Sequence, residues 1–136
     1  MRRALVALIL AGLAGCARRE EAACILPTQH DGVVAELFFG RDVPNRAPVS
    51  DAEWSDFSAT IIAASFPDGF TTFDGDGQWR NPATGHTSHE RTKILLVAAP
   101  RSPDLARRLD RVMSAYRERF NQISVGLITT DACAAF

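Results

Sequence analysis

The sequence predicts one α+β domain in which two helices cover one face of a four-stranded antiparallel sheet. Strand-like and helix-like segments follow one another in the order β-α-β-β-α-β. Both helical segments begin with a recognisable N-terminal cap. The chain has 136 residues, which is enough for one domain and too few for two. Its hydrophobic fraction of 46% is typical of a packed domain. This order of elements is the ferredoxin-like arrangement.

The first half of the domain supplies a strand and a capped helix. Residues 33–39 predict the first strand, which Gly40 ends. Residues 50–53, Ser-Asp-Ala-Glu, form a capping box and predict a helix that ends before Phe66. The apolar residues of this helix recur at helical spacing, at Trp54, Phe57, Ile61 and Ala64.

The second half supplies three strands and a second helix. Residues 70–73 predict the second strand, and Asp-Gly-Asp-Gly (74–77) predicts a tight turn. Residues 78–80 continue as strand in a small hairpin that decorates the sheet, and residues 81–85 predict another turn. The apolar run 92–98 is typical of a central strand. Ser-Pro-Asp at 102–104 begins a helix, and residues 124–130 predict the last strand. The apolar face of that helix contains Leu105, Leu109, Val112, Met113, Tyr116 and Phe120.

The N-terminal segment has the layout of a secretory signal. Arg2 and Arg3 precede an uncharged apolar run, and residues 13–16 read Leu-Ala-Gly-Cys. This tetrapeptide resembles the lipobox of bacterial lipoproteins. The resemblance implies that residues 1–15 are a signal peptide, that acyl chains on Cys16 hold the protein on a membrane, and that residues 16–32 form a tether.

The residue after Cys16 bears on the destination. Ala17 is not the aspartate of an inner-membrane retention signal, so the resemblance implies the periplasmic side of the outer membrane if the host has two membranes. A buried N-terminal helix and a single membrane span are the alternatives. The apolar run is shorter than the roughly 20 residues that a span needs.

Two cysteines remain once Cys16 is assigned to lipid. Cys24 and Cys133 form an even pair in an exported chain, which favours a disulfide over two free thiols. In the predicted topology the strand order is 4-1-3-2, so the first and last strands are antiparallel neighbours. The start of the first strand then lies near the end of the last. Both arguments predict a Cys24–Cys133 bridge.

The sequence lacks motifs for metal, cofactor or nucleic-acid chemistry. His86 and His89 lie in a predicted loop without a further evident ligand. Residues 74–85 depart from a calcium loop at Trp79 and Gly85, where a glycine and a glutamate are needed. No nucleophile elbow, Walker loop or dinucleotide fingerprint occurs. Loss of the leader changes the formal charge from −1 to −3, so we expect no metal, no cofactor and no nucleic acid.

Alternation along the first and third strands predicts the sheet face that the helices leave open. We place Glu36 and Phe38 of the first strand there, with Lys93 and Leu95 of the third. Glu36 and Lys93 would then lie on neighbouring strands and pair. One interpretation is a partly exposed salt bridge without a further role. The other is a contact surface, either a ligand pocket or a homodimer interface, because the rest of the face is apolar.

Several longer runs carry a resemblance to a known family. They are residues 35–41, 49–54, 66–69 and 77–80, and the pattern from Tyr116 to Val125. Over residues 33–136 they resemble the bacterial domain of unknown function numbered 3574. That family is similar in being small, exported and often lipidated. Its biochemical function is not established, so the resemblance implies no catalytic residue.

Two classes of function follow from these observations. The first is a non-catalytic envelope lipoprotein that binds a partner or a small ligand through the open sheet face. The second is a small enzyme of the dimeric ferredoxin-like barrel type, with Glu36 as its acid or base. An enzyme places more than one titratable group in its pocket. The sequence offers only Glu36, Lys93 and Tyr116, so we favour the first class.

Overall fold

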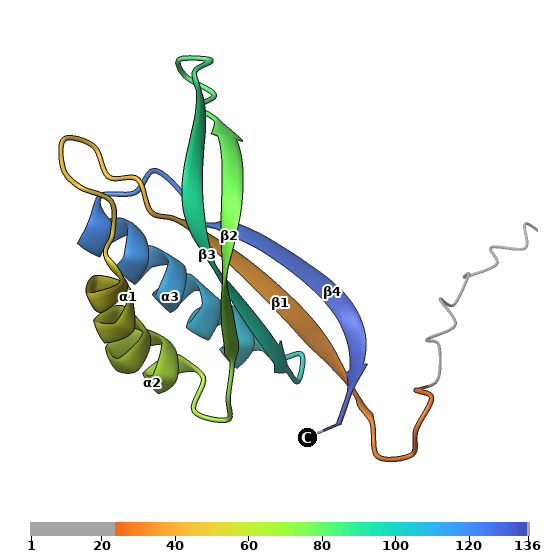
Figure 1. Ribbon diagram of the computed structural model, residues 1–136. Helices are drawn as coiled ribbons and strands as arrows, with labels where there is room; N and C mark the ends of the chain where they lie inside the picture. Colours follow the sequence, from red (N-terminus) through yellow and green to blue (C-terminus); the bar gives the residue numbers. More distant parts are fainter. Residues whose placement is uncertain (1–23, 136) are drawn as a thin grey trace, which may run out of the picture.

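The computed structural model describes residues 24–135, and the predicted signal peptide and Cys16 lie outside the described residues (Figure 1). None of the described helices is long and apolar enough to span a membrane. The elements, in chain order, are β1 (His30–Gly40), α1 (Asp51–Phe57), the π-helical turn η1 (Ser58–Ile62), α2 (Ala63–Ser65), β2 (Thr71–Arg80), β3 (Thr87–Ala99), α3 (Pro103–Phe120) and β4 (Gly126–Ala134).

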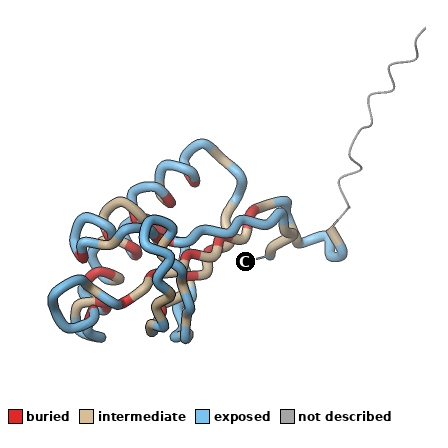
Figure 2. Tube along the Cα trace, turned by 90° about the horizontal axis from the view of Figure 1, so that it is seen from above, coloured by how far each residue is buried: buried red, intermediate tan, exposed pale blue. Residues whose placement is uncertain are grey.

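The four strands form one antiparallel sheet in the order β2-β3-β1-β4. Read from the other edge, this is the predicted order 4-1-3-2. The helices lie on one face of the sheet, and the other face is left open (Figures 1 and 2). The predicted α+β class is therefore confirmed. Strand β1 begins at His30, so the folded domain includes the last residues of the predicted tether.

Alternate residues of β1 build the core with the helices. Val33, Ala35, Leu37 and Phe39 are buried, whereas the residues between them are only partly covered. Phe39 meets the ring of Tyr116 with the centroids 4.8 Å apart, in an edge-to-face arrangement. The same cluster includes Trp54, Phe57 and Phe120. These aromatic contacts fix α1 and α3 against one face of β1.

The first helical segment keeps its predicted cap but changes its periodicity. The Ser50 hydroxyl accepts a hydrogen bond from the Glu53 N–H at 3.2 Å, and the Glu53 carboxylate accepts one from the Ser50 N–H at 2.8 Å. The turn η1 then adds one residue to the helical repeat. Ile62 is consequently the buried residue that follows Phe57, in place of the predicted Ile61.

Strands β2 and β3 form a longer hairpin than the sequence predicts. The predicted turn at residues 74–77 is wrong: Gly75 pairs with Thr92 and Gly77 with Glu90 in an uninterrupted ladder. The turn lies at residues 81–86, where the Asn81 side chain accepts the N–H of Ala83 at 2.9 Å. A turn at 74–77 would leave the first residues of β3 without hydrogen-bond partners. Residues 76–91, here called the hairpin arm, extend past the end of β1 (Figure 1).

A Cys24–Cys133 disulfide joins the segment before β1 to the end of β4, and its two Cα atoms are 5.6 Å apart. The predicted bridge is therefore confirmed. Strand register explains it, because His30 pairs with Ala134 and Asp31 with Cys133. The bridge lies at the opposite end of β1 from the hairpin arm.

Candidate functional site

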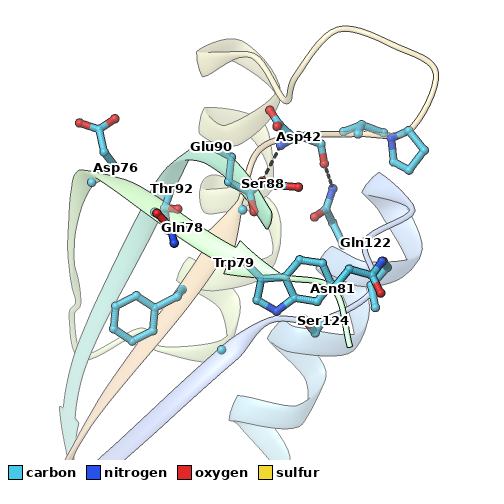
Figure 3. A pocket seen from close by; sticks show the side chains of 18 of the residues that line it. Asp42, Asp76, Gln78, Trp79, Asn81, Ser88, Glu90, Thr92, Gln122 and Ser124 are labelled. Atoms are coloured by element: carbon cyan, nitrogen blue, oxygen red, sulfur yellow. Dashed lines mark hydrogen bonds between the residues drawn. The ribbon is translucent and has the colours of Figure 1, made fainter. Parts of the chain in front are cut away.

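A half-open pocket of about 650 Å³ lies on the open sheet face, at the base of the hairpin arm (Figure 3). The arm forms one side, and the loops at residues 42–44 and 121–124 form the other. Its size lies within the range of small-molecule sites. The apolar part of its lining comes from Phe38, Trp79, Ile94 and Ile123.

Glycines hollow the sheet beneath this pocket. Gly40 of β1, Gly75 and Gly77 of β2, and Gly126 of β4 all line it, so three strands contribute glycines. A Cβ atom at Gly40 would lie 2.5 Å from the Glu90 carboxylate, and one at Gly77 would lie 2.6 Å from the Thr92 hydroxyl. Neither contact is possible without displacement of the neighbour. The absence of side chains at these positions therefore leaves the volume of the pocket open and allows the Glu90 carboxylate to lie over Gly40.

Glu90 is held in place from the 42–44 loop. The Asp42 N–H donates a hydrogen bond to Glu90 Oε2 at 3.0 Å, and Gln122 Nε2 donates one to the Asp42 carbonyl oxygen at 2.6 Å (Figure 3). These two bonds connect both loops to the arm. The carboxylate of Glu90 therefore has a defined position at the pocket wall, and its second oxygen is not engaged by this backbone bond.

The lining of the pocket is acidic. Asp42, Asp76 and Glu90 are among the residues that line it, and Glu90 places its carboxylate at the pocket wall. Among the described residues that line the pocket there is no lysine and no arginine, and His86 is the one residue with a basic side chain. The field inside this pocket therefore favours a neutral or positively charged ligand over an anion.

Tyr116 supports the pocket from the core side of the sheet. Its ring is fully buried, and its hydroxyl donates a hydrogen bond to the Gly40 carbonyl oxygen at 2.9 Å. Burial raises the pKa of this phenol well above its usual range. Tyr116, predicted as a titratable group of the site, is therefore a neutral core residue that fixes the end of β1.

The structure divides the four residues predicted for the open face into two pairs. Glu36 and Phe38 do lie on that face, and Phe38 lines the pocket. Glu36 does not line the pocket; its partners across the strands are Leu96 and Ile128. The homodimer interface predicted for this face stays a prediction.

The placement of Lys93 and Leu95 on the open face is wrong. Leu95 pairs with Leu37 and is completely buried beneath the helices, and Val97 is buried with it. The open face of β3 instead carries Ile94, Leu96 and Ala98. The prediction took Lys93 as evidence of exposure, whereas the lysine lies at the margin of the helix-covered face.

Lys93 belongs to an ion-pair cluster between the sheet and the start of α1. Its side chain is 12% exposed, and Nζ lies 2.7 Å from Asp74 and 3.4 Å from Asp51. Arg41 also lies 2.9 Å from Asp51. The Arg41 charge, followed by Lys93, lowers the pKa of Asp51. The hydrogen bond from Lys93 lowers the pKa of Asp74.

This cluster predicts a pH-dependent contribution to stability. An aspartate whose pKa is lower in the folded state stabilises it above the unfolded pKa, and this contribution disappears as the pH falls through the folded pKa. We expect Asp74→Asn to lower the Tm at pH 7 and the difference from wild type to narrow below about pH 4. Thermal unfolding measured from pH 7 to pH 2 checks this.

Asp76→Asn is the matched control, because Asp76 lies on the same strand and has no ion pair within the described part of the chain. Its Tm should follow that of wild type at every pH. A difference in Tm between Asp74→Asn and wild type that stays constant from pH 7 to pH 2 would contradict an ionic role for Asp74.

The cysteines and histidines do not assemble a metal-binding set in residues 24–135. Cys24, Asp31 and Cys133 lie together, with ligand atoms within 4.8 Å of one another. Both sulfurs belong to the disulfide, so neither is available as a thiolate. His86 lies in the hairpin turn, and His89 lies on β3 opposite Gln78.

Sequence reasoning missed the residues that define the pocket, Trp79, Glu90, Asp42 and Gln122. One signal for Glu90 was present, because period-two alternation extended back from Ile94 places Thr92, Glu90 and Ser88 on the same face. The predicted loop before residue 92 hid this pattern. Asp42 and Gln122 lie in loops that are far apart in the sequence, and only the tertiary structure brings them next to each other and to Glu90.

Comparisons with known proteins agree with this description. A family described as "Protein of unknown function (DUF3574)" matches residues 34–136. Among curated proteins, none matches the sequence. A phage SAM lyase in complex with S-methyl-5'-thioadenosine is similar in structure, with a TM-score of 0.61 and 16% identity over 77% of this chain and 90% of the phage chain. A phage SAM lyase in the apo state gives a TM-score of 0.56 and 15% identity over 78% and 90%. At these identities the similarity concerns the fold alone.

Proposed function

Because this chain belongs to the DUF3574 family, whose proteins have no established function, we infer its function from its own geometry. We propose that it is a small-molecule-binding domain of the cell envelope. Its ligand is a neutral or cationic molecule with a planar ring. The observation that carries this proposal is the glycine-hollowed pocket with Trp79 and a fixed Glu90 at its wall.

The lining supports this class of ligand. Trp79 and Phe38 offer aromatic surface, and a flat ring packs against such surface in a stacked or edge-on geometry. Glu90 and Asp42 favour positive charge, or supply acceptors to hydroxyl and amino groups of a neutral ligand. Phosphorylated ligands are disfavoured, because no lysine or arginine among the described lining residues would compensate their charge.

The structural neighbours suggest probes of this kind. One of them is a phage SAM lyase whose structure contains S-methyl-5'-thioadenosine, an uncharged nucleoside thioether with a purine ring. S-adenosylmethionine carries a sulfonium cation on the same nucleoside. Both molecules test the ring, and S-adenosylmethionine adds the sulfonium charge together with the ammonium and carboxylate of its methionine part.

An enzyme is the second candidate, and the fold that this chain shares with a lyase favours it. In that case Glu90 takes the role that the sequence assigned to Glu36, because Glu90 lines the pocket and Glu36 does not. We retain binding as the main proposal because Glu90 is the one carboxylate that both faces the pocket and has a fixed hydrogen-bond donor within the described residues.

We further propose that the domain is held on a membrane through acyl chains on Cys16. The basic residues, the short apolar run and the Leu-Ala-Gly-Cys sequence support this anchor. The Cys24–Cys133 disulfide is also consistent with export, because such bridges persist in oxidising compartments.

Calorimetry with wild type and three variants tests the proposed site. Trp79→Ala is expected to weaken binding of S-methyl-5'-thioadenosine about tenfold or more, because a stacked ring contributes about 1–3 kcal/mol. Glu90→Gln keeps the acceptor for the Asp42 N–H and removes the charge. It should weaken S-adenosylmethionine binding much more than binding of the uncharged thioether.

Phe73→Ala is the matched control, because Phe73 is an aromatic residue on the same face of β2 that does not line the pocket. Its affinity should equal that of wild type, and adenosine monophosphate should bind weakly to every protein. Wild type that binds neither probe, or a Trp79→Ala variant that binds as well as wild type, would contradict the proposal. If wild type converts S-adenosylmethionine to a product and Glu90→Gln does not, the result would instead support the second candidate function, an enzyme.

A further inference from the structure

Two large apolar side chains project into solvent just before β1. Ile25 is 91% exposed and Leu26 is 55% exposed, and they are neighbours in one short turn. Isolated exposed apolar residues are common on proteins. These two are notable for their place in the chain, because they directly follow the disulfide-bonded Cys24 and lie within the predicted tether.

The turn that presents them is fixed to the domain. The Leu26 N–H donates to Gln29 Oε1 at 3.0 Å, and the Gln29 N–H donates to the Leu26 carbonyl oxygen at 3.0 Å. Gln29 Nε2 also donates to the Cys133 carbonyl oxygen at 3.3 Å. With the Cys24–Cys133 bridge, these bonds hold the turn against the end of β4.

The length of the preceding chain limits how far this turn can lie from the anchor. Eight residue steps separate Cys16 from Cys24. A fully extended chain of this length spans less than about 30 Å. Acyl chains on Cys16 would therefore keep the Ile25–Leu26 turn near the bilayer surface. The hairpin arm lies at the opposite end of β1 (Figure 1), and the pocket lies at the base of that arm.

We propose that the Ile25–Leu26 turn inserts its side chains into the lipid interface and so orients the domain, with the disulfide end on the membrane and the pocket directed away from it. This inference rests on the proposed Cys16 anchor. The apolar side chains bury area among the acyl chains, and such interfacial contacts reach about 5–10 Å into the boundary of headgroups and acyl chains. The pocket then remains open to ligands from the aqueous compartment.

Tryptophan quenching in the full-length, membrane-extracted protein tests this orientation. The protein is reconstituted in phosphatidylethanolamine–phosphatidylglycerol vesicles with brominated acyl chains, and wild-type emission from Trp54 and Trp79 is subtracted. Ile25→Trp is expected to lose about half or more of its added emission to the brominated lipid, as for residues at the bilayer interface. Ile123→Trp is the matched control, because Ile123 is a 67% exposed isoleucine at the pocket end.

The outcomes separate the membrane contact from the anchor on which it rests. Intact mass should give a chain that begins at Cys16 and carries acyl groups. An unacylated chain would overturn both the anchor and the membrane contact. Acylated protein with unquenched Ile25→Trp emission would overturn the contact and leave the anchor. Equal quenching of Ile25→Trp and Ile123→Trp would overturn the orientation. A dimer that buries Ile25 against a second copy, with no quenching by the brominated lipid, would overturn the membrane contact.

Discussion

Leu95→Lys is expected to destabilise this domain more than the other substitutions that we propose. Leu95 is completely buried on the helix-covered face of β3, next to Leu37 on β1. A lysine there places a charge in the core without a partner, or is neutralised at a similar cost. The expected loss is about 4 kcal/mol or more in the free energy of unfolding, which is a large part of the roughly 5–15 kcal/mol that stabilises a typical domain. Chemical denaturation followed by circular dichroism measures it.

The neighbouring variant Leu96→Lys is the matched control. Leu96 lies on the open face and pairs with Glu36, so the new ammonium group can reach both water and a carboxylate. We expect its stability to remain within about 1 kcal/mol of wild type. Equal stability of the two variants would contradict the face assignment of β3. Because Leu95→Lys acts on the core, Leu96→Lys is also the variant suited to testing a homodimer through the open face.

Removal of the disulfide is expected to have the second-largest effect on stability. Cys24 and Cys133 are 109 residues apart, so their bridge restricts nearly the whole unfolded domain. The double variant Cys24→Ser/Cys133→Ser should lose about 2–5 kcal/mol, with a Tm lowered by roughly 10 °C or more. Calorimetric unfolding of the oxidised wild type and the double variant provides the comparison.

A reducing agent supplies the control for this experiment. It should lower the Tm of wild type to that of the double variant and leave the double variant unchanged. Below the Tm, both proteins should bind the same ligands, because the pocket lies at the other end of β1. A wild-type Tm that does not respond to reduction would contradict a stabilising bridge.

Local rules of sequence were sufficient for most of the fold. Capping residues fixed where the helices begin. Ser50, Glu53 and Ser102 accept hydrogen bonds from backbone N–H groups within a few residues, and Pro103 has no N–H that would need a partner. Alternation along residues 33–39 assigned β1 correctly, and Cys24 with Cys133 agreed with the strand order. These features depend on neighbours in sequence or on a chain topology with few alternatives.

The candidate site depended on contacts that no local rule describes. The Asp-Gly-Asp-Gly segment has the residues of a tight turn, but pairing with residues 90–93 keeps it extended. That pairing lengthens the hairpin and brings Glu90 over Gly40. It also decides the register of β3, and a shift of one residue moves every side chain to the other face.

The sequence by itself therefore determined the class of the domain, its helix starts, its strand order and its disulfide. Only the tertiary structure decided which face Leu95 and Lys93 occupy and where the pocket lies. The physical reason is the separation along the chain of the residues that interact. Caps and alternation are set by hydrogen bonds and burial within a few residues, whereas the pocket is formed by the β2–β3 register and by loops about 80 residues apart in the chain, as in the Gln122–Asp42 bond.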